Sequence, residues 1–321
     1  MQALIEKSDS LDALSCEQDL LDDILAGLRA PTKSLSPKYF YDEYGSQLFG
    51  KITQLPEYYP TRTELSLLAQ HATEIAQIIG QGRVLIEPGA GNCAKVRHLL
   101  PQLKPACYVP IDISHEFLFD AARKLQSEFE ALSIFPIADD MGSDIKLPSD
   151  VENLPRVVFY PGSTIGNYMP DDAVAFLRHI RNVIGADGGL LVGVDLQKDV
   201  DILHRAYNDT SGITAQFNLN ILRHINELTG ANFNLSQFGH IAFYNDNASR
   251  IEMHLESKAE QFISIAGEVI PLTAGERILT EYSYKYTTDS FAKMAAQAGL
   301  QVEKCWLDEE RLFSLQYYRA V

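Results

Sequence analysis

The sequence predicts an α/β protein with a Rossmann-like, mostly parallel sheet, a C-terminal antiparallel strand and a smaller inserted lobe. Three observations support this fold class. Apolar, strand-like runs alternate with helix-like stretches from about residue 64 to 196, as in parallel sheets covered by helices. The first run ends in a Gly-x-Gly turn and the next ends in an aspartate, a pattern typical of nucleotide-binding sheets. A block with a different period then interrupts the alternation.

Each predicted strand is a short apolar run bounded by turn residues, and each predicted helix has an apolar face with a period near 3.6. The predicted helices cover residues 64–79, a segment after Cys93, and residues 115–132, 171–184 and 288–299. The predicted strands cover residues 84–88, 108–113, 133–138, 157–160, 190–196, 301–307 and 313–319. We expect the last two strands to close the sheet as an antiparallel pair.

The inserted block combines a helical segment, FNLNILRHINELTG, with two strands of clear two-residue period, RIEMHLES and TEYSYKY. Such alternation is typical of a half-buried strand. We therefore expect a nucleotide-binding domain formed by residues 63–197 and 288–321. Residues 1–62 and 198–287 are expected to form a second lobe that binds the substrate.

Composition excludes several classes of partner. The 321 residues include 27 Lys and Arg against 43 Asp and Glu, a net charge of −16. Such acidity repels phosphate backbones and anionic lipid, so we expect no nucleic acid or membrane partner. The N-terminus has no cationic start or unbroken apolar run, unlike a signal peptide. The cysteines are scattered and show no CxxC spacing, which predicts reduced thiols in a cytoplasmic protein. The histidines show no HxxxH or HExxH spacing, so we expect no bound metal. We also expect the protein to be a monomer.

Polar or glycine-rich residues follow four predicted strands, and ligands of open α/β sheets bind beyond such strand ends. In EPGAG, Gly89 and Gly91 permit a sharp turn and a close approach to a ligand. Asp112 ends the next strand, where ribose hydroxyls would lie. Ala94 replaces the third glycine of the dinucleotide fingerprint, which disfavours an NAD dehydrogenase. An acid at the position of Glu87 is familiar from S-adenosylmethionine (SAM) sites. The alternative to a nucleoside site here is a plain tight turn at Gly89 and Gly91.

The third strand end is Asp139–Asp140. Together with the first two, it suits the amino-acid, ribose and adenine parts of a nucleoside ligand. The fourth strand end is PGSTIGN, in which Gly162 leaves backbone N–H groups open and Asn167 offers an amide that both donates and accepts. The alternative for Asn167 is a cap of the following helix.

The strand TEYSYKY suggests how a ring could be recognised. Alternation places Glu281, Ser283 and Lys285 on one face and three tyrosines on the other. A carboxylate and a hydroxyl about 6–7 Å apart bracket a flat ring with one donor and one acceptor, such as imidazole. The alternative is a polar face that meets water. Tyr207 and the run GITAQFNLN, which contains Thr214, complete a set of polar and aromatic residues. The tyrosine-rich N-terminal segments would suit a substrate that acquires a positive charge, because ring faces attract ammonium groups. The alternative is that these tyrosines only fill space.

Several long segments occur in the order of one family: KYFYDEYGSQLF, ITQLPEYYPTRTE, the Gly-x-Gly strand end, GSTIGN, AYNDTSGITAQFNLNIL, RIEMHL and GE-x-x-LTEYSYKY. Over roughly Ser34 to Tyr286, the chain resembles the SAM-dependent L-histidine Nα-methyltransferases of ergothioneine biosynthesis, which have the class I methyltransferase fold. The resemblance implies three methyl transfers to the α-amino nitrogen of histidine. The products would be hercynine (trimethylhistidine) and S-adenosylhomocysteine (SAH), formed without a metal.

The resemblance also implies which residues bind each ligand. The implied SAM site comprises Gly89, Lys95, Asp112, Asp140 and Met141. In the implied histidine site, Asn167 and Tyr207 hold the carboxylate, Glu281 and Ser283 hold the imidazole, Tyr58 contributes a further contact, Tyr41 lies near the reacting amine and Met253 lines the ring pocket.

The chain departs from the family pattern at the SAM site. Pro88 and Asn92 replace the residues expected around the Gly-x-Gly turn, and the loop over residues 139–144 differs from the sequence that is usual in the family. Two other functions stay open at this point. One is a methyltransferase for another amino acid or small amine, although an apolar or indole ring would leave Glu281 without a use. The other is a catalytically silent SAM-binding module.

Overall fold

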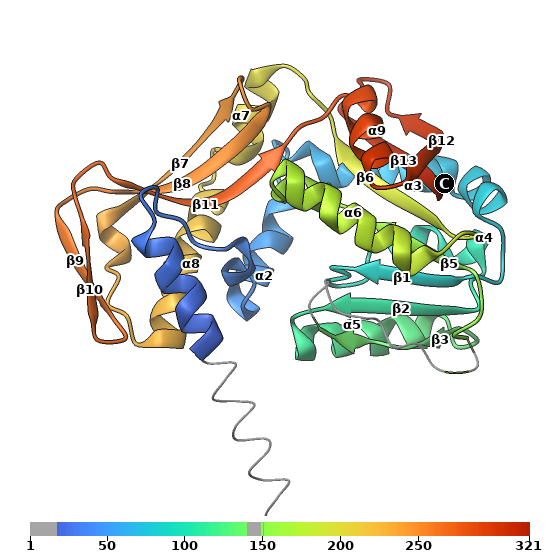
Figure 1. Ribbon diagram of the computed structural model, residues 1–321, viewed down its shortest axis with the longest axis horizontal. Coiled ribbons are helices and arrows are strands. Elements are labelled where there is room, and N and C mark those ends of the chain that lie inside the picture. The colour runs from blue at the N-terminus through green and yellow to red at the C-terminus, as the bar shows by residue number, and fades with distance from the viewer. Residues whose placement is uncertain (1–17, 140–148, 150) are drawn as a thin grey trace, which may run out of the picture. The chain divides into compact units, whose positions relative to one another are not determined.

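The computed structural model describes residues 18–139, 149 and 151–321 (Figure 1). Its contacts divide the chain into two compact units. Unit 1 contains the described part of residues 1–52 together with residues 207–244 and 252–281, and unit 2 contains residues 53–206, 245–251 and 282–321, apart from those not described.

Among the described residues, unit 2 is built on an eight-stranded sheet with the order β12-β13-β6-β5-β1-β2-β3, in which β4 also pairs with β2. The strands from β6 to β3 are parallel to their neighbours, whereas β13 is antiparallel to both β6 and β12. This topology confirms the predicted fold class. The strands are β1 (Val84–Pro88), β2 (Cys107–Asp112), β3 (Ser133–Ile134), β4 (Ile137–Ala138), β5 (Arg156–Tyr160), β6 (Gly189–Asp195), β12 (Leu300–Leu307) and β13 (Phe313–Ala320).

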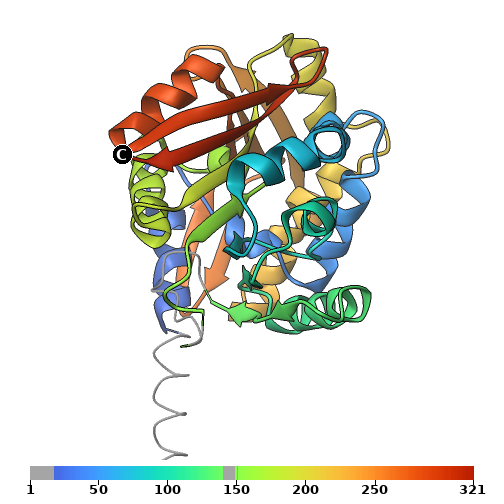
Figure 2. The ribbon, with the colours of Figure 1, turned by 90° about the vertical axis from the view of Figure 1, so that its right-hand side faces the viewer.

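Helices cover both faces of this sheet, because alternate residues of its central strands are buried on opposite sides. One apolar core contains residues of α6 (Pro170–Ile184) and α9 (Thr288–Gln297). The other contains residues of α3 (Tyr59–Ile79), the short α4 (Leu100–Leu103) and α5 (His115–Glu128). Figure 1 shows α6 lying along the sheet, and Figure 2 shows the antiparallel pair β12–β13 at its edge.

In its described part, unit 1 combines helices with small antiparallel sheets. Its elements include η1 (Pro37–Phe40), α2 (Glu43–Ile52), α8 (Ile213–Thr229), the hairpin of β9 (Gln261–Ile265) and β10 (Glu268–Leu272), and the sheet β11-β8-β7. The last sheet contains β7 (Phe238–Asn245), β8 (Arg250–Ser257) and β11 (Arg277–Tyr284), some of whose end residues belong to unit 2. Helix α2 packs closely, since a Cβ at Gly45 would lie 1.7 Å from the Phe40 carbonyl oxygen.

The structure corrects several bounds predicted from the sequence. The strand expected over 133–138 is two short strands, because Pro136 between them has no N–H for the sheet. The segment after Cys93 forms a 3₁₀ turn, Val96–His98, and the one-turn helix α4 in place of one longer helix. The sequence analysis missed α2, α7 (Val200–Tyr207), β7 and the hairpin β9–β10.

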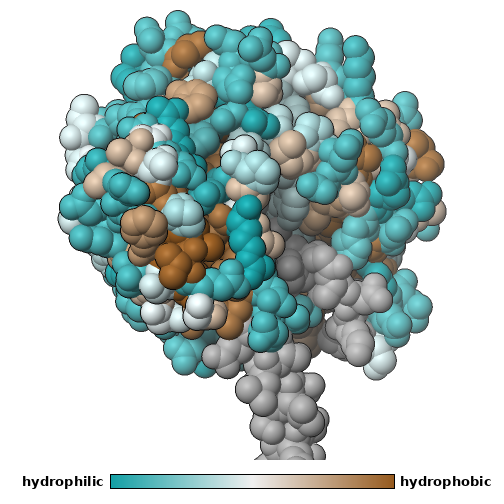
Figure 3. Space-filling view, turned by 60° about the vertical axis from the view of Figure 1, so that its left-hand side comes forward, coloured by the Kyte–Doolittle hydropathy of each residue, from teal (hydrophilic) through white to brown (hydrophobic). Residues whose placement is uncertain are grey.

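The surface shown in Figure 3 is largely hydrophilic. Hydrophilic residues cover most of the face shown in Figure 3, and hydrophobic residues gather in small patches. Phe262 and Val269 of the hairpin β9–β10 are among the exposed apolar side chains, at 60% and 58%. No helix in the described part of the chain combines the length and the apolarity that a membrane crossing needs.

Candidate functional site

The turn after β1 has a geometry suited to a ligand. Gly89 and Gly91 have φ values of 67° and 53°, a region that favours glycine. The Gly91 N–H donates to Asp112 Oδ2 at 2.9 Å, and the Ser114 N–H donates to Asp112 Oδ1 at 3.0 Å. Asp112 therefore ties the Gly-x-Gly turn to the end of β2. Since a carboxylate has about four acceptor positions, these two bonds leave capacity for ribose hydroxyls.

Glu87 lies beneath this turn and is only 2% exposed. The Tyr108 hydroxyl donates to Glu87 Oε2 at 2.5 Å. Burial raises the pKa of Glu87 to about 8, and the negative charges of Glu64 and Asp112 add to the rise, against the lowering effects of Tyr108 and Lys95. Glu87 is therefore largely protonated at neutral pH.

The raised pKa of Glu87 predicts a pH-dependent stability. Between about pH 4.5 and 8 the folded protein keeps a proton that the unfolded chain has released, so the free energy of unfolding falls as pH rises. Glu87→Gln lacks this loss. We expect the stability of Glu87→Gln relative to the wild type to increase with pH, by about 5 kcal/mol at most. Urea unfolding at several pH values measures this difference, and a pH-independent difference would contradict the assignment.

Glu64, on α3, links two predicted site residues. It is fully buried, accepts the Gly162 N–H at 2.8 and 3.0 Å, and forms an ion pair with Lys95 Nζ at 2.6 Å. Gly162 has φ +85°, and a Cβ there would lie 3.0 Å from Lys95 Nζ. The structure therefore brings together Lys95 of the predicted SAM site and Gly162 of the predicted substrate site. The sequence analysis did not single out Glu64, although it closes the segment PTRTE.

The loop after β5 carries Asn167 at the end of η3 (Thr164–Asn167). The N-cap of α6 is Met169, so the alternative role of Asn167 as the cap of that helix is wrong. Gly166 lies against the end of β11, since a Cβ there would come within 2.8 Å of the Tyr284 carbonyl oxygen. The loop that carries Asn167 is therefore adjacent to the segment that carries Ser283.

A buried charge cluster, which we call the Asp195 cluster, consists of Tyr59, Asp195, Lys198 and Lys285. Asp195, at the end of β6, is 1% exposed. Its carboxylate lies 2.7 Å from Lys285 Nζ and 2.5 Å from Lys198 Nζ, and it accepts the Tyr59 hydroxyl at 2.8 Å. Lys285 Nζ also donates to Ser283 Oγ at 2.8 Å. The sequence analysis placed Lys285 on the polar face of its strand but missed this cluster.

The charges of the cluster depend on one another. Burial raises the pKa of Asp195, but the ammonium groups of Lys285 and Lys198 outweigh it and hold the pKa below its ordinary value. Burial lowers the pKa of Lys198 to about 8, against the opposing effect of Asp195. Both ions are therefore charged at neutral pH because they are paired.

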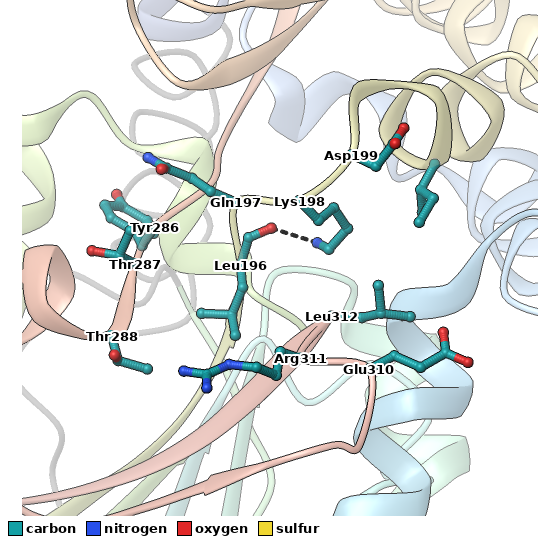
Figure 4. Close-up of a pocket in the computed structure, with 11 residues that line it drawn as sticks. Leu196, Gln197, Lys198, Asp199, Tyr286, Thr287, Thr288, Glu310, Arg311 and Leu312 are labelled. Atoms are coloured by element: carbon teal, nitrogen blue, oxygen red, sulfur yellow. Dashed lines mark hydrogen bonds between the residues drawn. The ribbon is translucent and has the colours of Figure 1, made fainter.

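A pocket in unit 2 lies beside this cluster (Figure 4). Lys198 lines it but turns its ammonium group toward the carbonyl oxygen of Leu196, at 2.5 Å. Arg311 and Glu310 contribute to another part of the lining. None of the described residues that the sequence analysis assigned to a site lines this pocket, so it is separate from the predicted ligand contacts.

Five of the predicted substrate residues belong to unit 1: Tyr41, Tyr207, Thr214, Met253 and Glu281. The Tyr41 ring packs edge-on against Phe217, with centroids 5.8 Å apart. At the start of α8, the Thr214 N–H donates to Asp209 Oδ1 at 2.8 Å.

Hydrogen bonds fix the surroundings of Tyr207 and Met253. His240 Nε2 lies 2.9 Å from the Tyr207 carbonyl oxygen, to which it donates, and Asn218 Nδ2 donates to His240 Nδ1 at 2.9 Å. The Thr280 hydroxyl bonds Asn218 Oδ1 at 2.7 Å and the Met253 carbonyl oxygen at 3.0 Å. Helix α8 is thereby joined to β8 and β11 beside Met253.

Three predicted site residues remain. Tyr58 belongs to unit 2 and precedes α3, and its N–H donates to the Leu55 carbonyl oxygen at 3.1 Å. Asp140 and Met141, which the sequence analysis assigned to SAM, lie outside the described residues.

The antiparallel β13 between β6 and β12, together with the Gly-x-Gly turn tied to Asp112, is typical of a class I SAM-dependent methyltransferase. Residues 20–320 match the family described as "Histidine-specific methyltransferase, SAM-dependent". The chain belongs to this family, which confirms the resemblance seen in the sequence.

Curated relatives agree with this membership. The chain is 37% identical to "Histidine N-alpha-methyltransferase" of Mycolicibacterium smegmatis, over 95% of this chain and 96% of the relative. It is also 37% identical to the protein with that name from Mycobacterium tuberculosis, over 91% and 92%. Identity to "Ergothioneine biosynthesis protein 1" of Neurospora crassa is 32%, over 85% of this chain and 32% of that longer relative.

Proposed function

We propose that the protein transfers methyl groups from SAM to the α-amino nitrogen of L-histidine, three times, and so makes hercynine for ergothioneine biosynthesis. The observation that carries this proposal is the match to the histidine-specific family over residues 20–320. The identity of 37% over nearly the full length of a histidine N-alpha-methyltransferase supports it.

The groups at the carboxyl ends of β1 and β2 fit SAM. We assign Gly89, Gly91 and Lys95, with Glu87 beneath them, to its amino-acid part. Asp112 has acceptor capacity for the ribose hydroxyls, since its two backbone bonds leave other lone pairs. The motif residues Asp140 and Met141 are assigned to the adenine part on the sequence alone.

We assign the histidine substrate to the residues that the family motif supplies. Glu281 and Ser283 stand two residues apart in β11, so their side chains leave the same side of the strand, and we propose that they bind the imidazole. Asn167 and Tyr207 are proposed to bind the carboxylate. The other proposed contacts are Tyr41, Tyr58, Gly162, Thr214 and Met253.

The proposed reaction is a direct displacement. The amine lone pair of histidine attacks the methyl group on the positively charged sulfur of SAM, in line with the departing sulfur. The protein positions the two reactants and excludes water. The amine must lose its proton first. A tyrosine with a pKa near 10 is a poor base at neutral pH, so we propose that Tyr41 orients the amine while water removes the proton. Aromatic ring faces are suited to the growing positive charge.

The proposed substrate is tested by measuring SAH formation from SAM with purified protein and each of the common amino acids. We expect rapid SAH formation with L-histidine and little with the others. Turnover with another amine but not with histidine would indicate a different methyltransferase. Binding of SAM without turnover on any amine would indicate a silent module.

We further propose that the protein is cytoplasmic, on the basis of the scattered cysteines. We also propose that it is a monomer.

A further inference from the structure

We infer that Asn220 of helix α8 is a positioning residue for Tyr41. It holds the backbone on both sides of Tyr41, so that the Tyr41 hydroxyl stays at the place from which it orients the substrate amine. This role rests on the proposed function for one point, the assignment of Tyr41 to the amine. The contacts that support it all lie within unit 1.

The side-chain amide of Asn220 contacts the residues directly before and after Tyr41. Asn220 is 2% exposed. Its Nδ2 donates to Asp42 Oδ1 at 2.7 Å and to the Phe40 carbonyl oxygen at 3.4 Å. An amide nitrogen carries two donors, and a carbonyl oxygen can only accept, so the nitrogen of the amide must face Phe40. One buried side chain thereby ties both neighbours of Tyr41 to α8.

The orientation of the Asn220 amide is fixed by its surroundings. Arg223, one turn further along α8, donates from Nε to Asn220 Oδ1 at 2.7 Å and forms an ion pair with the Asp42 carboxylate. Since a guanidinium group only donates and an ionised carboxylate only accepts, a flipped amide would place its oxygen against Asp42 and its N–H groups against Arg223. Helix α2 packs against α8 (Figure 1), and a Cβ at Gly45 would lie 2.8 Å from Asn220 Nδ2. The amide therefore has one favourable orientation and little room to move.

The Tyr41 ring is held by aromatic side chains. Phe217, one turn before Asn220 on α8, stacks on Phe40 with ring centroids 4.5 Å apart. The Tyr41 ring lies edge-on to Phe217 at 5.8 Å and to Phe49 of α2 at 5.9 Å, a favourable geometry for aromatic pairs. Because α8 fixes the backbone through Asn220 and contacts the ring through Phe217, the position of the Tyr41 hydroxyl depends on α8.

Asn220→Ala should lower kcat for SAH formation from L-histidine by at least about 10-fold and up to about 100-fold, since a small displacement of an orienting group costs this much. The KM for histidine should change far less, because the proposed carboxylate and imidazole contacts do not include Asn220. The matched control is Asn226→Ala on the same helix. Asn226 bonds the backbone N–H and the carbonyl oxygen of Phe233 at 2.9 and 2.8 Å and so holds the loop after α8. Its loss should leave kcat close to that of the wild type.

A double-mutant cycle with Tyr41→Phe tests whether Asn220 acts through Tyr41, since this substitution removes the hydroxyl and keeps the ring. The effect of Asn220→Ala on kcat should be much smaller in Tyr41→Phe than in the wild type, because residues that act as a unit are not additive. A general loosening of the fold predicts the same fold loss of kcat in both backgrounds. Equal losses would therefore overturn the inference.

The outcomes separate the inference from the proposed function. A wild type that forms no SAH with histidine would refute the proposed function, and the inference with it. Histidine turnover that Tyr41→Phe leaves unchanged would refute the role of Tyr41 and the inference, while the proposed substrate stands. A cooperative thermal unfolding transition above the assay temperature is the check of folding. If Asn220→Ala fails this check, Arg223→Met decides by the same comparison in the two backgrounds, since the Arg223 side chain is 32% exposed and its loss leaves Asn220 in place.

Discussion

Asp195→Asn is expected to lower the free energy of unfolding by about 3–5 kcal/mol, because it removes the charge from a carboxylate that is buried between two ammonium groups. Asparagine keeps the size of the side chain, so the loss reports the charge and not a cavity. Lys285 and Lys198, which lie 2.7 and 2.5 Å from the carboxylate, would be left as buried cations with a weaker partner. Urea unfolding at neutral pH measures the effect.

The pH dependence of this loss is a further part of the prediction. Because the pKa of Asp195 is held below its ordinary value of 3.8, its contribution to stability is present above about pH 4 and is lost as pH falls through the folded-state pKa. The difference between wild type and Asp195→Asn should therefore shrink in acid. Asp187→Asn, at an exposed position, is the matched control and should change stability by less than about 0.5 kcal/mol. Equal effects of the two substitutions would contradict the account.

Glu281→Ala is expected to weaken histidine binding by roughly 10- to 150-fold while leaving SAH binding unchanged. The physical reason is the loss of a charge-assisted hydrogen bond to the imidazole N–H, which typically contributes about 1.5–3 kcal/mol. Titration calorimetry with L-histidine and with SAH measures the two affinities separately on the same preparation.

Glu281→Gln is the matched control for this substitution. Its amide oxygen still accepts a hydrogen bond, so we expect a smaller loss of histidine affinity than in Glu281→Ala. Equal losses of histidine and SAH affinity in Glu281→Ala would show a general disturbance of the protein and would rule out the proposed contact with the imidazole.

The fold was predictable where its signals are local. The apolar runs at Val84–Pro88 and Arg156–Tyr160, separated by helix-like segments, indicate a parallel sheet without knowledge of any long-range contact. The hairpin β9–β10 was missed, and part of the reason is that Phe262 and Val269 are apolar yet exposed. Pro136, in contrast, could have been recognised from the sequence. It splits the strand predicted over residues 133–138, because a proline has no N–H to donate to a sheet.

The candidate site was predictable only in part. Gly91 and Asp112 stand 21 positions apart, which is close to a known spacing of nucleotide-binding sheets, and the structure joins these two residues by a hydrogen bond. The pair formed by Asp195 and Lys285 joins residues 90 positions apart. No local period predicts such a pair, because it depends on how the segment after β11 pairs with the end of β6. Lys285 was therefore expected only on a polar strand face, whereas the structure buries it.

The most direct test of the central claim is mass spectrometry of L-histidine after incubation with the purified protein and SAM. The account predicts a product that carries three added methyl groups, all on the α-amino nitrogen, with three SAH molecules formed for each. Unchanged histidine in a sample whose SAM binding has been confirmed, or methyl groups on the imidazole ring, would contradict it.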